Sequence, residues 1–396
     1  MKDSKQLTYI CIGLFYVLLF SMEAWFLGRV PTWLTGVIEI VLIFIMNSHV
    51  NQYCPNNTFK YSVGFIVALL IAIFWNYSSS FGITMSNLFS VVIMYLLMKM
   101  SDPKKLIILG TITKWFSILL TISTIAWLLH WIIPFPNFGS VYRAGEYNSH
   151  NVNYLFFTEL LSDPFRFKSV FLEPGHVSMI ATYFIAANRF NFKNIYVLLL
   201  SLCIIPTFGL SGYVLFAIGY ALYSIEEGKT YTIIRRILPI ALIFGGSILY
   251  FEDYNGGDNL FNELIMARLE TDEEKGIVGN DRIDPIMEAE FNKAVENGEI
   301  IGGINSDRIR ELYKRGGTGS GAKVYTLQHG VIGSFFLLLG YFLLSRGSRY
   351  RRWAFFMFLI YAISFFQRVY FFWAAYYIPY ICALALPPTN KNNMNK

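Results

Sequence analysis

The fold of this chain is decided by a stretch near its C-terminus, residues 325–352, which read YTLQHGVIGSFFLLLGYFLLSRGSRYRR. Residues 325–345 contain no Asp, Glu, Lys or Arg. A run of this length can cross a bilayer as a helix, which takes about 20 mostly apolar residues. Residues 346–352 then carry four arginines, and such clusters are typical of cytoplasmic loops. The stretch therefore predicts a membrane span that ends on the cytoplasmic side.

The rest of the chain repeats this pattern. Of its 396 residues 55% are hydrophobic and 15% charged, whereas an ordinary soluble domain is about 25% charged. We therefore predict an all-α fold, a polytopic transmembrane bundle of about twelve spans. The predicted spans are 8–27, 32–47, 61–76, 81–99, 115–133, 173–188, 194–208, 210–225, 236–251, 325–345, 353–366 and 369–385. Residues 103–114 are bracketed by lysines and predict a separate interfacial helix.

Lysines and arginines of the short loops set the orientation. When the spans alternate backwards from 346–352, the basic short loops and both termini fall on the cytoplasmic side. The polar segments 134–167 and 252–324 then lie outside. We expect three parts. The first is 1–251, with helices one to nine and the external loop 134–167. The second is 252–324, a structured external cap. The third is 325–396, with helices ten to twelve and a cytoplasmic tail.

Several classes of function have no signature in this sequence. Its four cysteines show no paired spacing, which argues against disulfides and zinc. Its five histidines are scattered, and no nucleotide-binding motif occurs. The net charge of +6 mostly reflects the basic loops that orient the spans. We therefore predict no metal, no cofactor and no nucleic-acid partner.

The first candidate site is residues 166–176, RFKSVFLEPGH, where an external loop meets the sixth predicted span. Glu173 suits the cap position before a helix that starts with proline. His176 follows three residues later and shares its helical face. Helix N-termini attract anions, and Arg166 and Lys168 add positive charge, so a phosphate or pyrophosphate is the expected ligand. The alternative is that Glu173 only caps the helix while the basic residues contact lipid headgroups.

The second candidate site lies where the external cap returns to the membrane. His329 falls in the first turns of the tenth predicted span, and an ionisable residue there is a functional hypothesis by default. A neutral imidazole could take a proton from a sugar hydroxyl. The alternative is a structural histidine that bonds to a neighbouring helix. The external segments also hold Arg143, Arg282, Arg308, Arg310, Lys323 and Tyr325.

Four segments together resemble the bacterial O-antigen polymerase and O-antigen ligase superfamily. They are Arg166-x-x-Ser169-x-Phe171-x-Glu173-Pro174, Phe208-Gly-Leu-Ser211-Gly, Ile300-Ile-Gly302-Gly303-Ile and Leu327-Gln-His-Gly330-Val-Ile-Gly333. The layout is similar too, with about a dozen spans and one large external loop before the last few. Gly319-Ser320 stands where ligases usually carry a histidine-asparagine pair. This departure weakens the ligase interpretation and leaves the base unassigned. His329 is the substitute candidate, followed by Lys323 and Tyr325.

The resemblance implies a GT-C-like, metal-independent glycosyltransferase of the bacterial inner membrane that polymerises repeat units of O-antigen (lipopolysaccharide) or capsule on the periplasmic side. Donor and acceptor would be oligosaccharides linked to undecaprenyl pyrophosphate, with a chain-length regulator and a flippase as possible partners. Arg166 matches the family's first diphosphate-binding arginine, and a second would come from Arg282, Arg308 or Arg310. Lys168, Arg143, Lys323 and Tyr325 are the further residues expected to bind the diphosphate or sugar. We expect Arg166, Glu173, His176 and His329 to carry catalysis. The alternatives are a ligase that transfers glycan to lipid A core, and a flippase or transporter of lipid-linked oligosaccharide.

Overall fold

The structure of this chain is a computed structural model, and its described residues are mainly α-helical. The described residues are 2–28, 30–50, 56–76, 81–143, 149–228, 230–259, 261–266, 271–272, 276–277, 284–317, 319 and 321–387. This confirms the predicted helical class. Two small antiparallel sheets in the external segments were not predicted.

Each of the twelve predicted spans coincides with a helix. They are α1 (Lys2–Ser21), α2 (Thr32–Asn47), α3 (Asn56–Phe74), α4 (Phe81–Lys99), α5 (Asp102–His130), α6 (Pro174–Ala187), α7 (Ile195–Ile204), α8 (Leu210–Glu227), α9 (Thr230–Asp253), α12 (Ala322–Arg346), α13 (Arg351–Phe365) and α14 (Ala374–Ala383). The separate interfacial helix predicted at 103–114 is wrong, because α5 runs through it without a break. Ile108 and Leu109 are buried there, so the segment packs on protein instead of lying along the bilayer surface.

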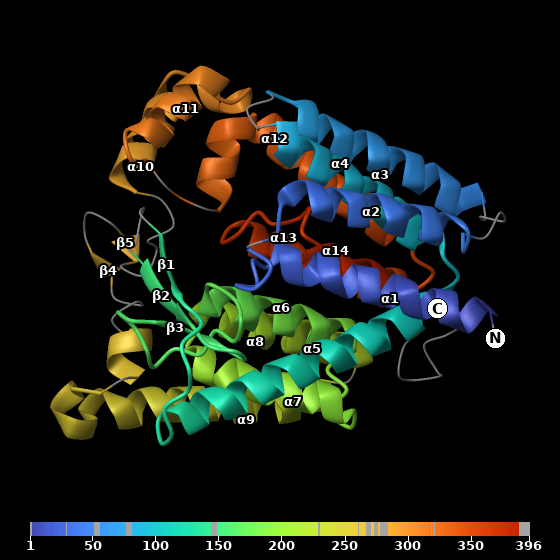
Figure 1. The fold of residues 1–396 in the computed structure, drawn as a ribbon. Helices are drawn as coiled ribbons and strands as arrows, with labels where there is room; N and C mark the ends of the chain where they lie inside the picture. The colour runs from blue at the N-terminus through green and yellow to red at the C-terminus, as the bar shows by residue number, and fades with distance from the viewer. Residues whose placement is uncertain are drawn as a thin grey trace.

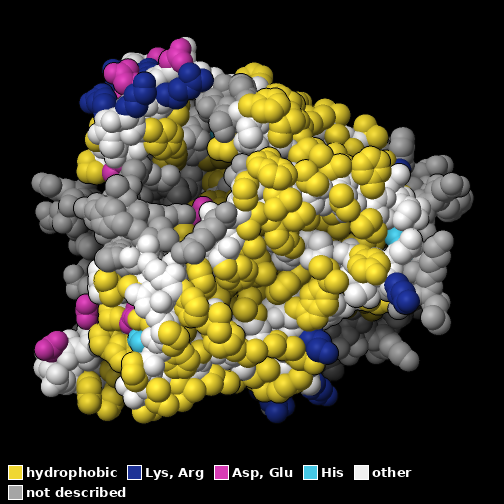
Figure 2. All heavy atoms as spheres, viewed as in Figure 1, with side chains coloured by type: hydrophobic (Ala, Val, Ile, Leu, Met, Phe, Trp, Pro, Cys, Tyr) yellow, Lys and Arg dark blue, Asp and Glu magenta, His cyan; other side chains and the backbone are white. Residues whose placement is uncertain are grey.

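Among the described residues three helices, α4, α5 and α12, are long and apolar enough to cross a membrane. Three is fewer than the twelve spans predicted from the sequence. The lengths of α6 and α14 show why. Their 14 and 10 residues extend about 21 and 15 Å, against a hydrocarbon core of about 30 Å. Figure 2 shows hydrophobic side chains over much of the helical face, with charged side chains gathered towards its ends.

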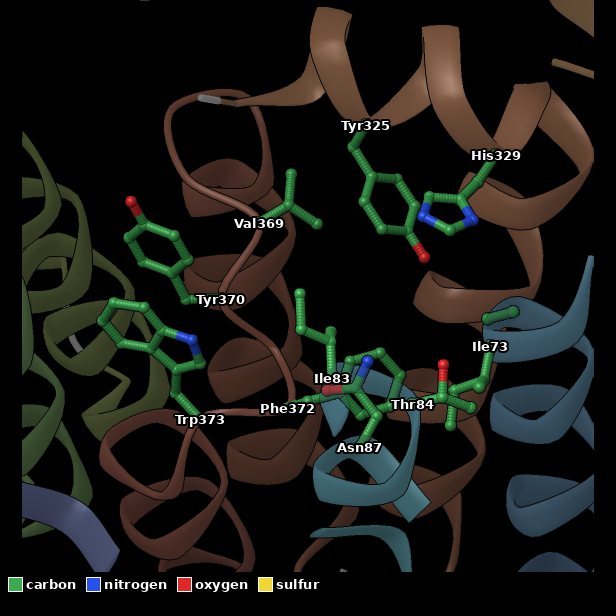
Figure 3. Close-up of a pocket in the computed structure, with 11 residues that line it drawn as sticks. Ile73, Ile83, Thr84, Asn87, Tyr325, His329, Val369, Tyr370, Phe372 and Trp373 are labelled. Atoms are coloured by element: carbon green, nitrogen blue, oxygen red, sulfur yellow. The ribbon is translucent and has the colours of Figure 1, made fainter. Parts of the chain in front are cut away.

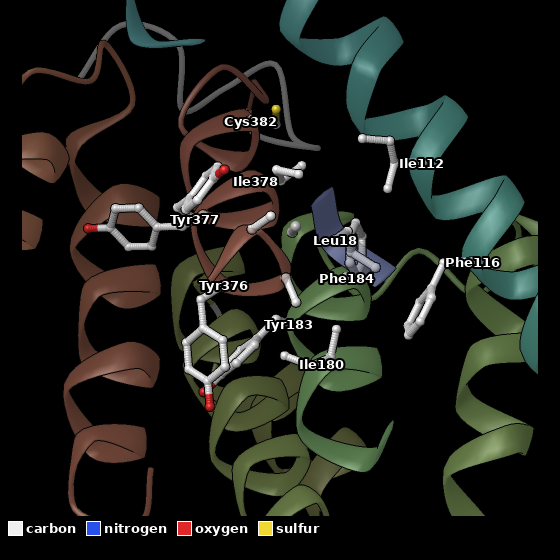
Figure 4. Close-up of a cluster of buried hydrophobic side chains, with 14 of the residues drawn as sticks. Leu18, Ile112, Phe116, Ile180, Tyr183, Phe184, Tyr376, Tyr377, Ile378 and Cys382 are labelled. Atoms are coloured by element: carbon white, nitrogen blue, oxygen red, sulfur yellow. The ribbon is translucent and has the colours of Figure 1, made fainter. Parts of the chain in front are cut away.

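The centre of the bundle is formed by α6 and α14, whose residues are all buried. Figure 4 shows Tyr183 of α6 beside Tyr376 of α14, and Phe184 of α6 on the side of Phe116 of α5. A helix that is apolar all round needs such an enclosed position. The α6 helix thereby becomes a fixed support whose two ends carry the polar residues discussed below.

The segments that the sequence predicts to be external lie at one end of the helices, and the N-terminus of α1 lies at the other (Figure 1). One sheet joins β1 (Ser140–Arg143), β2 (Ser149–Asn153) and β3 (Thr158–Leu160), and a second joins β4 (Thr271–Asp272) and β5 (Gly276–Ile277). The helices of the external cap are α10 (Pro285–Glu296) and α11 (Ser306–Lys314). Single-turn helices are η1 (Ile205–Thr207), η2 (Tyr254–Gly257), η3 (Asn262–Met266) and η4 (Glu299–Ile301). Asp284 starts α10 by accepting a hydrogen bond from the Met287 amide at 2.9 Å.

A break in α12 at Gly330, with φ 70° and ψ 173°, joins the cap to the bundle. A Cβ atom at Gly330 would lie 2.4 Å from the Ile301 carbonyl oxygen, so only glycine fits this approach. Asn76, which follows α3, donates from Nδ2 to the carbonyls of Ile304 and Gln328 at 2.6 and 2.8 Å. The glycine pair at 302–303 and the His329-Gly330 segment therefore meet, although the sequence separates them.

Candidate active site

The loop between α13 and α14 places Arg368 against the N-terminal end of α6. Its guanidinium donates to the Glu173 carboxylate, to Nε2 of His176 at 2.8 Å and to the Tyr370 hydroxyl at 2.9 Å. We call these four residues the Arg368 cluster. The Arg368 side chain is 7% exposed and that of Glu173 is 43% exposed. The cluster is therefore anchored inside the protein and open on the side of its carboxylate.

The Arg368 cluster decides between the two interpretations of Glu173. The backbone of Glu173 is extended, at φ −132° and ψ 135°, but its side chain makes no capping hydrogen bond. The interpretation of Glu173 as a simple cap is therefore wrong. The predicted shared face is confirmed, because Glu173 and His176 contact the same guanidinium. Since a guanidinium only donates, Nε2 of His176 is an acceptor here, and this contact occupies the lone pair that a base would need.

Two stacked rings, Tyr370 of the Arg368 cluster and Trp373, line a cavity beside this cluster. Their centroids are 3.8 Å apart with an interplanar angle of 6°. The His176 ring meets both edge-on, at 5.4 and 5.2 Å. One wall thus faces the charged cluster and also lines the neighbouring cavity.

The cavity has a volume of about 190 Å³. The ends of α3 and α4, the first turns of α12 and the loop before α14 supply its walls. Figure 3 shows Tyr370 and Trp373 on one side, Tyr325 and His329 on the other, and Asn87 below them. No Lys, Arg, Asp or Glu is among the described lining residues. The cavity is therefore a neutral, aromatic-walled compartment beside a charged one.

One ring nitrogen of His329, Nδ1, makes a hydrogen bond, and the other, Nε2, can still accept one. Nδ1 lies 3.3 Å from the Trp75 carbonyl oxygen. A carbonyl only accepts, so the ring proton sits on Nδ1 and Nε2 keeps its lone pair. The Tyr325 ring packs against the imidazole at 4.4 Å, and the Tyr325 hydroxyl is buried without a hydrogen-bond partner among the described residues. The structural interpretation of His329 thus accounts for Nδ1 but not for Nε2.

Arg166 and Lys168 belong neither to the Arg368 cluster nor to the described lining of the cavity. Arg166 lies 3.3 Å from Asp163, and its nitrogens approach the carbonyls of Thr207 and Phe208 at 3.4 and 3.5 Å. These contacts brace the turn that precedes α8. Lys168 is buried and donates to Asn151 of β2. Burial lowers the pKa of Lys168 to about 7, so only part of the population is charged at neutral pH.

Three cations predicted to bind substrate, Arg308, Arg310 and Lys323, pair with carboxylates of the cap. Arg308 binds Glu290 and also Glu299 at 2.7 Å. The exposed Arg310 pairs with Asp307 at 3.2 Å, and Lys323 pairs with Glu288 at 2.6 Å. Arg282 and the side chain of Arg143 lie outside the described residues. The diphosphate-binding role of these cations stays a prediction.

Sequence analysis missed Arg368, Tyr370 and Trp373. A signal was present, because Arg368 lies in the short turn between the last two predicted spans. The alternation places this turn outside, so Arg368 departs from the rule that short basic loops lie inside. A cation placed against that rule needs a specific partner, and Glu173 is that partner.

Comparison with known proteins adds no relative. No protein-family model, no curated protein and no solved structure matches the chain. Among the described residues, no three histidine, cysteine or carboxylate side chains form a group that could hold a metal ion. The expectation of a reaction without metal or cofactor stays a prediction.

Proposed function

We propose that this chain is an integral glycosyltransferase of the bacterial inner membrane that polymerises oligosaccharide repeat units linked to undecaprenyl pyrophosphate. One observation carries the proposal. The Arg368 cluster and the imidazole of His329 lie beside one cavity at the external end of the bundle. The four motif segments and their order support the same class of reaction.

In the proposed reaction, His329 acts on the acceptor and Arg368 acts on the leaving diphosphate. An acceptor hydroxyl gives its proton to Nε2 of His329, and its oxygen bonds to the anomeric carbon of the donor sugar. The bond from that carbon to the diphosphate oxygen breaks, and its electron pair leaves with undecaprenyl pyrophosphate. Arg368 stabilises the charge on the leaving group, and such electrostatic stabilisation is usually a large catalytic contribution. The Arg368 side chain is 7% exposed, while its carboxylate partner is open to solvent, so the diphosphate would approach the guanidinium from the side of Glu173.

The proposal also covers the membrane arrangement. The shorter apolar helices, among them parts of α1, α2, α3 and α7, would complete the bilayer-embedded bundle around α4, α5 and α12. The cap and the first sheet would then lie on the periplasmic side, with both termini in the cytoplasm. A flippase would deliver the substrate to this side, and a chain-length regulator would set the product size.

The test is Arg368→Lys in the native host, with surface glycan separated on a gel and the protein level measured beside it. Lysine keeps the charge but loses the planar, multi-donor geometry. The expected result is that the ladder collapses to one repeat unit on its acceptor at a normal protein level. The activity falls by about 100-fold, the loss typical of one transition-state donor.

The matched control is Arg349→Lys, because Arg349 is exposed between α12 and α13 and belongs to neither candidate site; its ladder should not change. Loss of every repeat unit in Arg368→Lys would favour the ligase or flippase alternatives. An unchanged ladder would remove Arg368 from the mechanism and contradict the proposal.

A further inference from the structure

The cavity beside Tyr370 and Trp373 has a composition that restricts its occupant. Its walls combine aromatic and aliphatic side chains with a few polar groups, a typical lining of small-molecule sites. Its volume of about 190 Å³ leaves room for a ligand the size of one sugar ring. The absence of Lys and Arg among the described lining residues argues against a diphosphate in this compartment, because a buried anion needs a cationic partner.

A hydrocarbon chain fits the polar groups of the cavity poorly. The Tyr325 hydroxyl is buried and has no hydrogen-bond partner among the described residues, and Figure 3 shows it on the lower side of the ring, below His329. Nε2 of His329 keeps its lone pair, since Nδ1 is the nitrogen bound to Trp75. A prenyl tail would leave both groups unsatisfied in an apolar site, which is costly. A ligand with hydroxyl groups can satisfy both.

The aromatic wall adds the second requirement. The stacked Tyr370 and Trp373 rings form a flat apolar surface, and the polar groups of Tyr325, His329 and Asn87 lie on other sides of the cavity (Figure 3). A pyranose ring has the matching chemistry, with an apolar C–H face for stacking and hydroxyls around its edge.

We propose that this cavity is a binding subsite for one uncharged sugar ring of the acceptor, with the ring on the Tyr370–Trp373 wall and a hydroxyl held by Tyr325 beside His329. The assignment to the acceptor rests on the proposed function; the sugar-binding cavity itself does not. The Tyr370–Trp373 wall then borders both parts of the site, the cavity for the neutral acceptor sugar and the region of the diphosphate near Arg368.

The test measures binding without turnover. The probes are methyl glycosides of the sugars that acid hydrolysis releases from the host's surface polymer, and farnesol serves as the hydrocarbon probe. Binding to the purified full-length protein in detergent micelles is followed by saturation-transfer NMR. We expect at least one glycoside to bind. Trp373→Leu should weaken its binding about tenfold or more, and Tyr325→Phe about two- to tenfold, the range for one hydrogen bond.

The controls make the same chemical changes on the exposed surface: Trp33→Leu and Tyr9→Phe, at side chains that are 69% and 57% exposed. Neither should alter binding. The proposal is overturned if no glycoside binds, if Trp373→Leu and Tyr325→Phe behave like these controls, or if farnesol displaces the glycoside. If Trp373 and Tyr325 control binding while Arg368→Lys leaves the glycan ladder intact, the sugar subsite stands and the proposed polymerase function fails.

Discussion

Two buried arginines occupy opposite ends of α6, and they differ in what surrounds them. Just past the C-terminal end, Arg189 pairs with Glu226 at 2.5 Å, donates to the Leu386 carbonyl at 3.1 Å and lies over Trp353. At the N-terminal end, Arg368 pairs with Glu173 and donates to His176 and Tyr370. Both guanidiniums have a carboxylate and an aromatic neighbour.

The carboxylates make the difference. The Glu226 side chain is 8% exposed, and that of Glu173 is 43% exposed. Both side chains of the Arg189 pair are therefore buried. The pair holds α8 and the segment just after α14 to α6. The Arg368 pair is open on one member and shares its aromatic wall with a cavity. The same pair of residue types is closed to solvent at one end of α6 and open at the other, and only the open pair is proposed to bind substrate.

The largest expected effect is at the closed pair. Arg189→Ala leaves the Glu226 carboxylate buried without its partner, and such a change costs about 3–5 kcal/mol. Thermal unfolding of the purified protein in detergent measures this loss. The double variant Arg189→Ala with Glu226→Ala should recover part of the stability, because no lone buried charge remains. A double variant no more stable than the single one would contradict the account.

A smaller loss of stability is expected at the open pair. In Arg368→Ala the Glu173 carboxylate can be hydrated, so the expected cost is about 1–3 kcal/mol, the range for a hydrogen bond to a charged group. The same unfolding measurement compares the two alanine variants directly. Equal destabilisation by Arg368→Ala and Arg189→Ala would mean that both pairs are structural. It would contradict the distinction drawn between the closed and the open pair.

The smallest expected effect is a pH dependence of the free energy of unfolding that comes from Lys168. Burial lowers the pKa of Lys168 to about 7 in the folded chain, from about 10.5 in the unfolded chain. Between these values the unfolded chain binds more protons, so the free energy of unfolding rises with pH. The expected gain is about 1 kcal/mol between pH 7 and pH 8. Lys168→Met should remove it in unfolding measured at both pH values, whereas a gain that survives this substitution must come from another group.

The helices could be predicted from sequence because each apolar segment carries its own signal. The shared face of Glu173 and His176 was predictable for a related reason, since helical spacing is local. The sheet from β1 to β3 was missed, because its short strands gain their pairing only from one another. The long α5 was divided in two, because burial of Ile108 and Leu109 against other helices is not visible in a local pattern.

The sequence by itself determined that the chain is helical and apolar, where each helix lies along it, and which stretches carry unusual polar residues. Only the tertiary structure decided which of them meet. It joined Arg368 to Glu173 across almost 200 residues, and the 302–303 glycine pair to Gly330. The physical reason is that helix formation depends on neighbours within a few residues. A buried ion pair and a shared cavity depend instead on how distant helices pack, which local patterns do not record.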